Sequence, residues 1–176
     1  DNRVLILGLG NTILTDDGVG IYAARRAREI LQSTASTAET AGIDVTEAEL
    51  AGFSLLDLLD GYPHAVIVDA LHSTGRKPGE IVPIALANFT SATHLSAGHE
   101  IDLPTAVELA RQMGQEVPRE ITIIGVQIAD DRTLSEECTP EVKAAIEPAA
   151  LLALEKARLM RDEDGAWMAR ILAQVT

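Results

Sequence analysis

Short apolar runs, each about the length of a β-strand, recur along this chain and are separated by stretches with helical periodicity. Continuous apolar runs predict buried strands at residues 4–9, 65–69 and 121–126. Residues 43–48 alternate apolar and polar positions, which predicts an edge strand, and residues 80–84 predict one further strand. The predicted strands are therefore spread over most of the sequence.

Helices are predicted over four of the intervening stretches, at residues 18–32, 53–59, 103–113 and 140–160. In the first of them one apolar face collects Val19, Ala23, Arg26, Ala27 and Ile30. Ser54 is a favourable N-cap for the second, and Pro104 fits the first turn of the third. We expect a shorter helix from Gly165, within a peripheral C-terminal stretch of about residues 162–176. Residues 87–98 are polar and predict a long loop, a kind of segment that often carries function.

This alternation predicts an α/β fold, with a mostly parallel or mixed sheet covered by helices on both faces. The 176 residues suffice for one domain with a sizeable core, and without internal repeats we expect a single domain over residues 1–176. Hydrophobic residues make up 47% of the sequence but aromatic residues only 3%. The core must therefore be built from Val, Ile, Leu and Ala.

The formal net charge of −13 argues against nucleic acid or an anionic membrane as a partner, because phosphate groups are bound by clustered Lys and Arg. The single cysteine, Cys138, excludes a disulfide framework and a thiolate zinc cluster within one chain. The sequence shows no signal peptide and no apolar run long enough to cross a membrane. We therefore expect a reducing, cytoplasmic location.

The loop after the first strand, residues 8–20 (GLGNTILTDDGVG), carries the most chemical information. Glycines follow the buried strand, and Asp16 and Asp17 stand at the start of the next helix. One acid is enough to cap a helix, for roughly 1 kcal/mol, and two adjacent side chains do not point at the same target. One carboxylate is thus available for chemistry, and a cation explains the pair better than a bound phosphate does.

A dinucleotide site is the alternative interpretation of this loop. Gly8 and Gly10 match the first two glycines of the Gly-x-Gly-x-x-Gly fingerprint, and Glu47 or Glu49 would then bind the ribose. The third glycine position holds Ile13, however, and several more residues precede the helix. A glycine motif alone is a weak signal.

Further candidate ligands lie along the chain. Asp69 ends the predicted strand at residues 65–69, where an acid either faces a site at the carboxyl edge of the sheet or marks the exit of the chain into solvent. Among the four histidines, His99 follows a small, flexible segment and precedes a helix, which suits an imidazole projected into a site; His94 and His72 compete with it. Two carboxylates and one imidazole would make a three-point site for nickel or zinc, although no close-spaced ligand pair supports it.

The chain resembles the hydrogenase maturation endopeptidases, which process the large subunit of nickel-iron hydrogenases. The resemblance rests on residues 8–20, on Ile67-Val68-Asp69-Ala70, on His99, and on Ile123-Ile124-Gly125-Val126 followed by the Pro-rich start of the last helix. Order and spacing agree up to about Ala149. The resemblance implies a three-layer α/β/α sandwich around a twisted sheet of about five strands.

The resemblance also implies a metal site of Asp17, Asp69 and His99, with Asp16 in a structural role. The implied activity is removal of the C-terminal extension from a hydrogenase large-subunit precursor that already holds nickel, by a monomer that binds the precursor transiently. Nickel then serves for recognition, and a catalytic role for it stays open, as does its replacement by other divalent ions. The alternatives are a non-catalytic, nickel-sensing maturation chaperone and, less favoured, a dinucleotide-binding enzyme.

Two departures from the family pattern and one residue outside it bear on this hypothesis. Residues 48–52 (AELAG) stand where the family often has a glycine-rich stretch, so Glu49 adds charge near the expected site. Ala97-Gly98 stands where the family often has Ser-Pro before the histidine, which loosens the placement of His99. Cys138 lies in an acidic stretch, Ser135-Glu136-Glu137-Cys138, which disfavours a thiolate nucleophile.

Overall fold

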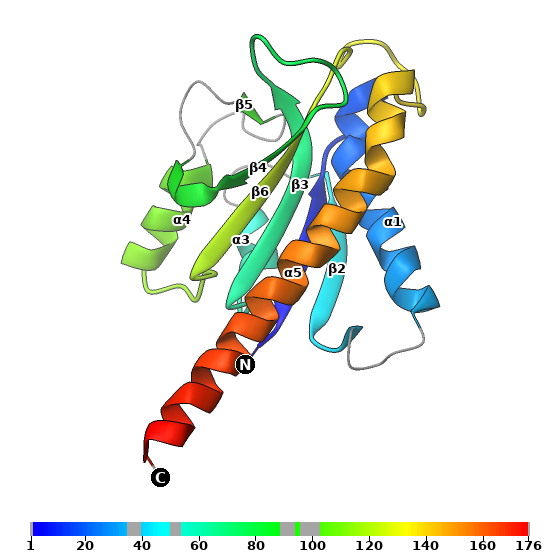
Figure 1. The fold of residues 1–176 in the computed structure, drawn as a ribbon. Helices are drawn as coiled ribbons and strands as arrows, with labels where there is room; N and C mark the ends of the chain where they lie inside the picture. The colour runs from blue at the N-terminus through cyan, green and yellow to red at the C-terminus, as the bar shows by residue number, and fades with distance from the viewer. Residues whose placement is uncertain (1, 35–39, 50–53, 89–93, 96–102, 176) are drawn as a thin grey trace.

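The fold is a twisted sheet with helices on both faces, as Figure 1 shows for a computed structural model that describes residues 2–34, 40–49, 54–88, 94–95 and 103–175. The main path of the sheet has the order β2-β1-β3-β6-β4, and a short strand, β5, pairs with β3. The strands are β1 (Val4–Leu9), β2 (Ile43–Ala48), β3 (His64–His72), β4 (Ile81–Ala85), β5 (His94–Leu95) and β6 (Glu120–Gln127).

The sheet is mixed, as predicted. Strands β2, β1, β3 and β6 are parallel to one another, whereas β4 is antiparallel to β6 and β5 is antiparallel to β3. The expected edge strand at residues 43–48 is confirmed as β2. Strand β4 forms the other edge of the main path and contains Pro83, a residue that sheets accept at their edges because it donates no ladder hydrogen bond.

Successive side chains of each central strand serve opposite layers of the sandwich. Val4 and Ile6 of β1 belong to a core cluster with helices α1 (Val19–Ser33) and α5 (Pro140–Val175). Leu5 and Leu7 belong to a second cluster with α3 (Ser54–Leu59) and α4 (Leu103–Gln112). The resulting three layers confirm the α/β/α sandwich (Figure 1). No helix in the described part of the chain combines the length and the apolar character that a membrane span requires.

Four sequence-based expectations differ from the structure. The loop predicted at residues 87–98 contains the short strand β5. Strand β3 does not end at Asp69 but continues to His72, because Ala70 and the residue after it still pair with β6. No separate helix begins at Gly165, since α5 runs through it to Val175; one glycine lowers helix stability by only about 1 kcal/mol and does not end a helix by itself. Arg26 is not part of the apolar face of α1 and instead makes ion pairs with Glu29 and Glu147.

Helix α1 begins directly against the carboxyl ends of β1 and β3, and two glycines make this approach possible. A Cβ atom on Gly8 would lie 2.3 Å from the carbonyl oxygen of Gly20. A Cβ atom on Gly20 would lie 2.2 Å from the carbonyl oxygen of Val68 and 2.3 Å from that of Leu9. The backbones therefore touch where any side chain would separate them, and the loop before α1 is held at this edge of the sheet.

We expect Gly20→Ala to lower the free energy of unfolding by about 3 kcal/mol, because the added methyl group meets two backbone carbonyls that cannot move independently of the sheet. Helix propensity alone predicts the opposite sign, a gain of about 1 kcal/mol. Urea denaturation measures the difference. Gly114→Ala is the control: its φ is +79° with nothing near the added atom, so it should cost only about 1 kcal/mol. A stabilised Gly20→Ala variant would contradict this account of the packing.

Candidate active site

The candidate site is built around the loop between β1 and α1, which closes back on the end of β1. Gly10 has a φ of +143°, and a Cβ atom there would lie 1.9 Å from the carbonyl oxygen of Asp17. The amide of Asn11 donates a hydrogen bond to that same oxygen at 3.3 Å. Only glycine at position 10 allows this closure, which fixes the backbone of Asp17 at the carboxyl end of β1.

Thr15 turns the chain immediately before the two acids. Its φ of 43° is the one positive value for a non-glycine among the described residues, and this conformation is strained for a β-branched side chain. Three contacts with a distant segment hold it. Its amide donates to the carbonyl oxygen of Ser135 at 2.9 Å, its hydroxyl donates to that of Thr133 at 2.5 Å, and its own carbonyl oxygen accepts from the Cys138 thiol at 3.5 Å. The short 3₁₀-helix η1 (Thr15–Gly18) begins at this turn.

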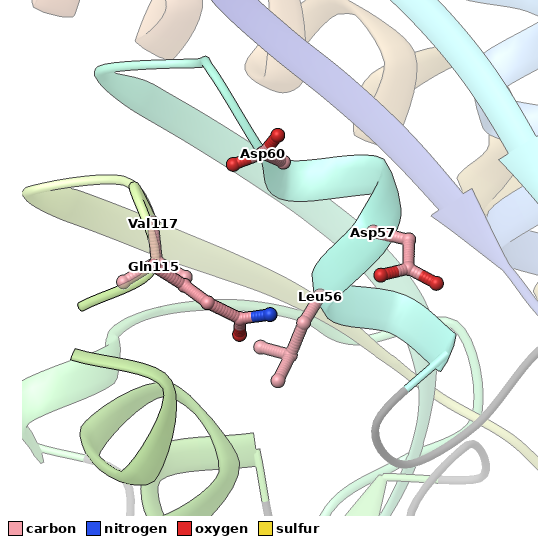
Figure 2. Close-up of a pocket in the computed structure, with 5 residues that line it drawn as sticks. All are labelled: Leu56, Asp57, Asp60, Gln115 and Val117. Atoms are coloured by element: carbon pink, nitrogen blue, oxygen red, sulfur yellow. The ribbon is translucent and has the colours of Figure 1, made fainter. Parts of the chain in front are cut away.

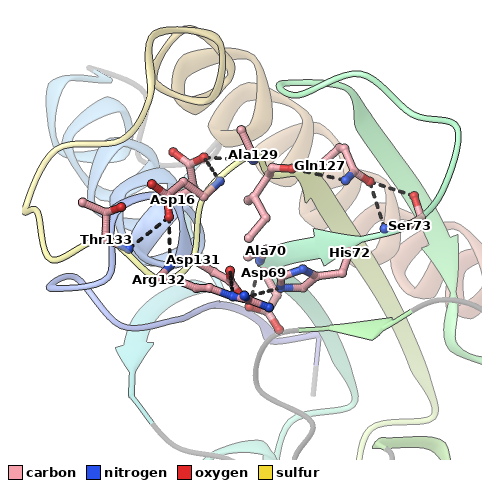
Figure 3. Close-up of polar contacts among 12 residues, drawn as sticks. Asp16, Asp69, Ala70, His72, Ser73, Gln127, Ala129, Asp131, Arg132 and Thr133 are labelled. Atoms are coloured by element: carbon pink, nitrogen blue, oxygen red, sulfur yellow. Dashed lines mark hydrogen bonds and ion pairs between the residues drawn. The ribbon is translucent and has the colours of Figure 1, made fainter.

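Asp16 is fully buried, and its carboxylate is a structural hub. One oxygen, Oδ2, accepts from the amides of Ala129 and Asp130, both at 3.0 Å (Figure 3). The other, Oδ1, accepts from the amide of Thr139 at 2.7 Å, and the Thr139 hydroxyl donates at 2.9 Å. These bonds join the β1–α1 loop to the segment after β6 and to the N-terminus of α5. The structural role expected for Asp16 is confirmed.

Asp69 and Asp17 lie at the same edge of the sheet. The pairing of β1 with β3 ends at Gly8 and Val68, so Asp69 stands one residue beyond it, opposite Gly125 of β6. Asp69 is fully buried, and its Oδ1 accepts from the amide of Ala70 at 2.8 Å. The 3₁₀-helix that contains Asp17 packs against β3. The fold therefore brings these two acids, 52 positions apart by their numbers, to one end of two adjacent strands.

The third member of the expected site, His99, lies outside the described residues. Of the competing histidines, His72 ends β3 and places its Nε2 3.5 Å from Oδ2 of Asp131 (Figure 3). The backbone of His94, in β5, pairs with that of His72. His64 lies at the opposite, amino end of β3. Among the described residues no three His, Cys, Asp or Glu side chains gather closely enough to hold a metal ion.

A cavity of about 360 Å³ lies away from these acids, between α3 and the segment that follows α4 (Figure 2). Leu56 and Gln115 extend toward each other across it, and Asp57, Asp60 and Val117 complete its lining. Among its described lining residues there is no histidine, cysteine or hydroxyl group, so its only ionisable groups are the carboxylates of Asp57 and Asp60.

Comparisons with known proteins identify the family. The model of the HycI hydrogenase maturation protease family matches residues 27–156. The hydrogenase 2 maturation protease of Escherichia coli strain K12 is 31% identical over 156 residues, which cover 84% of this chain and 85% of that protein. The chain belongs to the hydrogenase maturation protease family.

Solved structures of the family have the same fold. The HybD protease of Thermococcus kodakarensis superimposes with a TM-score of 0.66 at 28% identity, covering 88% of this chain and 99% of that one. The HybD endopeptidase of E. coli gives a TM-score of 0.64, also at 28% identity, covering 89% and 92%. As a hydrogenase maturation protease, the chain is a peptidase, and its acids at the sheet edge are the groups to consider first.

The dinucleotide interpretation of the loop is wrong for this protease. The N-terminus of α1 is not open to a pyrophosphate, because the 3₁₀-helix η1 (Thr15–Gly18) leads directly into it. Glu47 is engaged by Arg25 and Arg28 in ion pairs of 2.7 and 3.0 Å. These two arginines hold the pKa of the Glu47 carboxyl below its ordinary value against the opposing effect of burial. Glu47 is thus occupied between β2 and α1.

Glu49 does lie beside the glycine loop, as its position in the sequence suggested. Its Oε1 accepts a hydrogen bond from the Thr12 hydroxyl at 3.4 Å. Thr139 was not identified from the sequence. Thr before Pro is a favourable start for a helix and is the signal that could have identified it as the N-cap of α5. Its partner, Asp16, lies 123 positions away, and no local pattern reports such a contact.

Cys138 is not available as a nucleophile. The thiol is buried, and burial is the main reason that its pKa is raised to about 11; the Asp16 carboxylate raises it further and Lys143 opposes the shift. Burial and the Asp16 carboxylate, rather than Glu136 and Glu137, therefore disfavour the thiolate that the acidic stretch was expected to disfavour. A raised pKa makes this thiol a poor nucleophile at neutral pH.

We expect Asp16→Asn to lower the free energy of unfolding by about 3 kcal/mol, because an amide loses the charge of these hydrogen bonds and turns an NH₂ group toward donors. Chemical denaturation measures this loss. Asp57→Asn, at an exposed position of α3, is the control and should change stability by less than about 0.5 kcal/mol. Equal stabilities of the two variants would show that the hydrogen bonds of Asp16 do not stabilise the fold.

We expect Cys138 to react slowly with iodoacetamide in the folded protein. With a pKa of about 11, roughly one thiol in a thousand is ionised at pH 8, against about a quarter for a free cysteine. The labelling rate should rise about tenfold per pH unit from pH 8 to 10, since only the thiolate reacts. Mass spectrometry follows the reaction, and the unfolded chain in denaturant is the control. Rapid labelling of the native protein at pH 8 would contradict the assigned shift.

Proposed function

We propose that this chain is the endopeptidase that removes the C-terminal extension from the large-subunit precursor of a nickel-iron hydrogenase. The single observation that carries this proposal is membership of the hydrogenase maturation protease family. The structure adds support, because Asp17 and Asp69 lie at one edge of the sheet and no alternative nucleophile of the cysteine type is available. The enzyme acts as a monomer in the cytoplasm and binds its precursor transiently.

Asp17, Asp69 and His99 are the proposed catalytic and metal-contacting residues. Support for His99 comes from β5, whose Leu95 pairs with Leu71, two residues beyond Asp69. His99 follows Leu95 by four residues, a stretch that reaches about 14 Å at most when extended. The length of the chain is therefore compatible with an imidazole beside the two acids. His72 is the alternative imidazole, because it lies at the same end of β3.

Nickel enters this proposal as part of the substrate. Two carboxylates and one imidazole fit a borderline divalent ion and leave coordination positions for the ligands that the precursor itself supplies. The metal marks a precursor that is ready for cleavage, and when bound it also supplies a positive charge that polarises a water or the scissile carbonyl. With no thiolate ligand, the free enzyme should hold nickel weakly and lose it on dialysis.

We expect Asp17→Asn, Asp69→Asn and His99→Ala each to abolish processing of nickel-loaded precursor while the circular dichroism spectrum stays unchanged. Each change removes one ligand or charge at the proposed site. The shortening of the large subunit, followed by mass spectrometry, is the measurement. Asp60→Asn and Cys138→Ser are the matched controls and should process normally. If one of the three variants processes precursor at the normal rate, the residue that it changes is not part of the site. Loss of activity in His72→Ala instead of His99→Ala would identify His72 as the imidazole.

The same assay separates this proposal from its rival, a non-catalytic chaperone that senses nickel in the precursor. A chaperone would bind the nickel-loaded precursor without shortening it. Purified wild-type protein and precursor, with no other component, therefore decide between the two functions. An unchanged mass after prolonged incubation, together with a stable complex, would favour the chaperone.

A further inference from the structure

Two large apolar side chains are exposed at the rim of the loop that carries Asp17. Ile13 exposes 52% of its surface and Leu134 exposes 76%. Their backbones belong to paired segments, since Leu14 and Ser135 form a parallel bridge whose register sets Ile13 opposite Leu134. Paired backbone segments lie about 5 Å apart, so Ile13 and Leu134 are neighbours across this bridge. Residues distant in sequence thus form one small apolar surface, here called the Ile13–Leu134 surface.

The backbone holds this surface in place. The amide of Ile13 donates to Oδ1 of Asn11 at 3.1 Å, and the carbonyl oxygen of Ile13 accepts from the amide of Ser135 at 3.1 Å. In the opposite segment, the residue before Leu134 is Thr133, whose carbonyl oxygen accepts from the Thr15 hydroxyl at 2.5 Å. Hydrogen bonds therefore hold the backbone in the conformation that exposes both side chains. A ligand that covers them gains apolar contact without first ordering the loop.

The position of the surface distinguishes it from other exposed apolar residues. Among the described residues the remaining large ones are Leu109 of α4, Met113 directly after that helix, and Leu151 and Leu159 of α5. Ile13, in contrast, precedes Asp17 by four residues in a loop whose backbone closes onto the end of β1. The Ile13–Leu134 surface therefore borders the loop that carries Asp17.

We propose that the Ile13–Leu134 surface binds an apolar side chain of the precursor segment next to the scissile peptide bond and so helps to select which sequence is cut. This inference rests on the proposed function. The surface is covered only while such a segment is docked, so its contribution is to the binding of substrate rather than to bond cleavage. Ile13 and Leu134 are accordingly specificity-determining residues, and the acids at the sheet edge are the catalytic ones.

The test compares the kinetics of precursor processing by serine variants. Ile13→Ser and Leu134→Ser should each raise KM about fivefold, and the double variant about twentyfold, with kcat unchanged, because each change removes a half-buried aliphatic contact in the complex. Ile13→Leu, which keeps the apolar contact, should restore the KM. Leu151→Ser and Leu159→Ser, at residues of similar exposure on α5, are the matched controls and should leave both constants unchanged. Unchanged thermal midpoints show that the variants are folded.

A second arm identifies the occupant. Precursor residues that flank the cut are changed to serine one at a time and combined with Ile13→Ser in double-mutant cycles. One apolar residue of the segment should couple, so that the combined change in KM is smaller than the product of the single changes. A normal KM of the double Ile13/Leu134 variant overturns the inference while wild-type processing upholds the proposed function. Coupling only to residues remote from the cut overturns it as well, and failure of the wild type to process precursor overturns the proposed function itself.

Discussion

The hydrogen bonds to the Asp16 carboxylate are the interaction on which the geometry at the carboxyl edge of β1 and β3 depends. A buried carboxylate costs several kcal/mol unless hydrogen bonds and favourable charges compensate it. Here the amides of Ala129, Asp130 and Thr139 and the Thr139 hydroxyl all donate to it, and it lies at the positive N-terminal end of α5. These donors are more than 110 positions away in sequence and meet only in the complete sheet. The β1–α1 loop, the segment after β6 and α5 are thereby fixed as a unit.

The same interaction separates the roles of two neighbouring acids. Asp16 and Asp17 both belong to the 3₁₀-helix η1, in which three residues complete a turn and successive side chains are rotated by about 120°. Once Asp16 is directed into the protein by its four donors, Asp17 must point elsewhere. The left-handed backbone of Thr15 turns the chain so that Asp16 and Asp17 point in different directions. The close approach of Gly10 to the carbonyl oxygen of Asp17 holds the backbone of Asp17 at the end of β1. The loop thus holds Asp17 in a 3₁₀-helix that packs against the strand containing Asp69.

The sequence predicted the layers of this fold better than the ends of its elements. Continuous Val, Ile and Leu runs identify β1, β3 and β6 because a central strand buries both faces, and the alternation in residues 43–48 identifies the edge strand β2. The end of β3 was missed because Asp69 is polar yet paired: its burial comes from β6 and η1, which local sequence does not report. The same holds for the site. Adjacent acids after a glycine loop are visible in the sequence, but the partners of Asp16 and the pairing of Ile13 with Leu134 exist only through contacts between distant segments.

The packing around Asp16 also disfavours ionisation of the Cys138 thiol. The Cys138 thiol donates to the carbonyl oxygen of Thr15 and lies within the field of Asp16, so the residues that position the acids also keep this sulfur protonated. A thiolate here would add a second negative charge to a region already occupied by a buried carboxylate, and the fold opposes it both by desolvation and by repulsion. The proposed function accordingly assigns hydrolysis to the carboxylates at the edge of β1 and β3, acting with water and a cation.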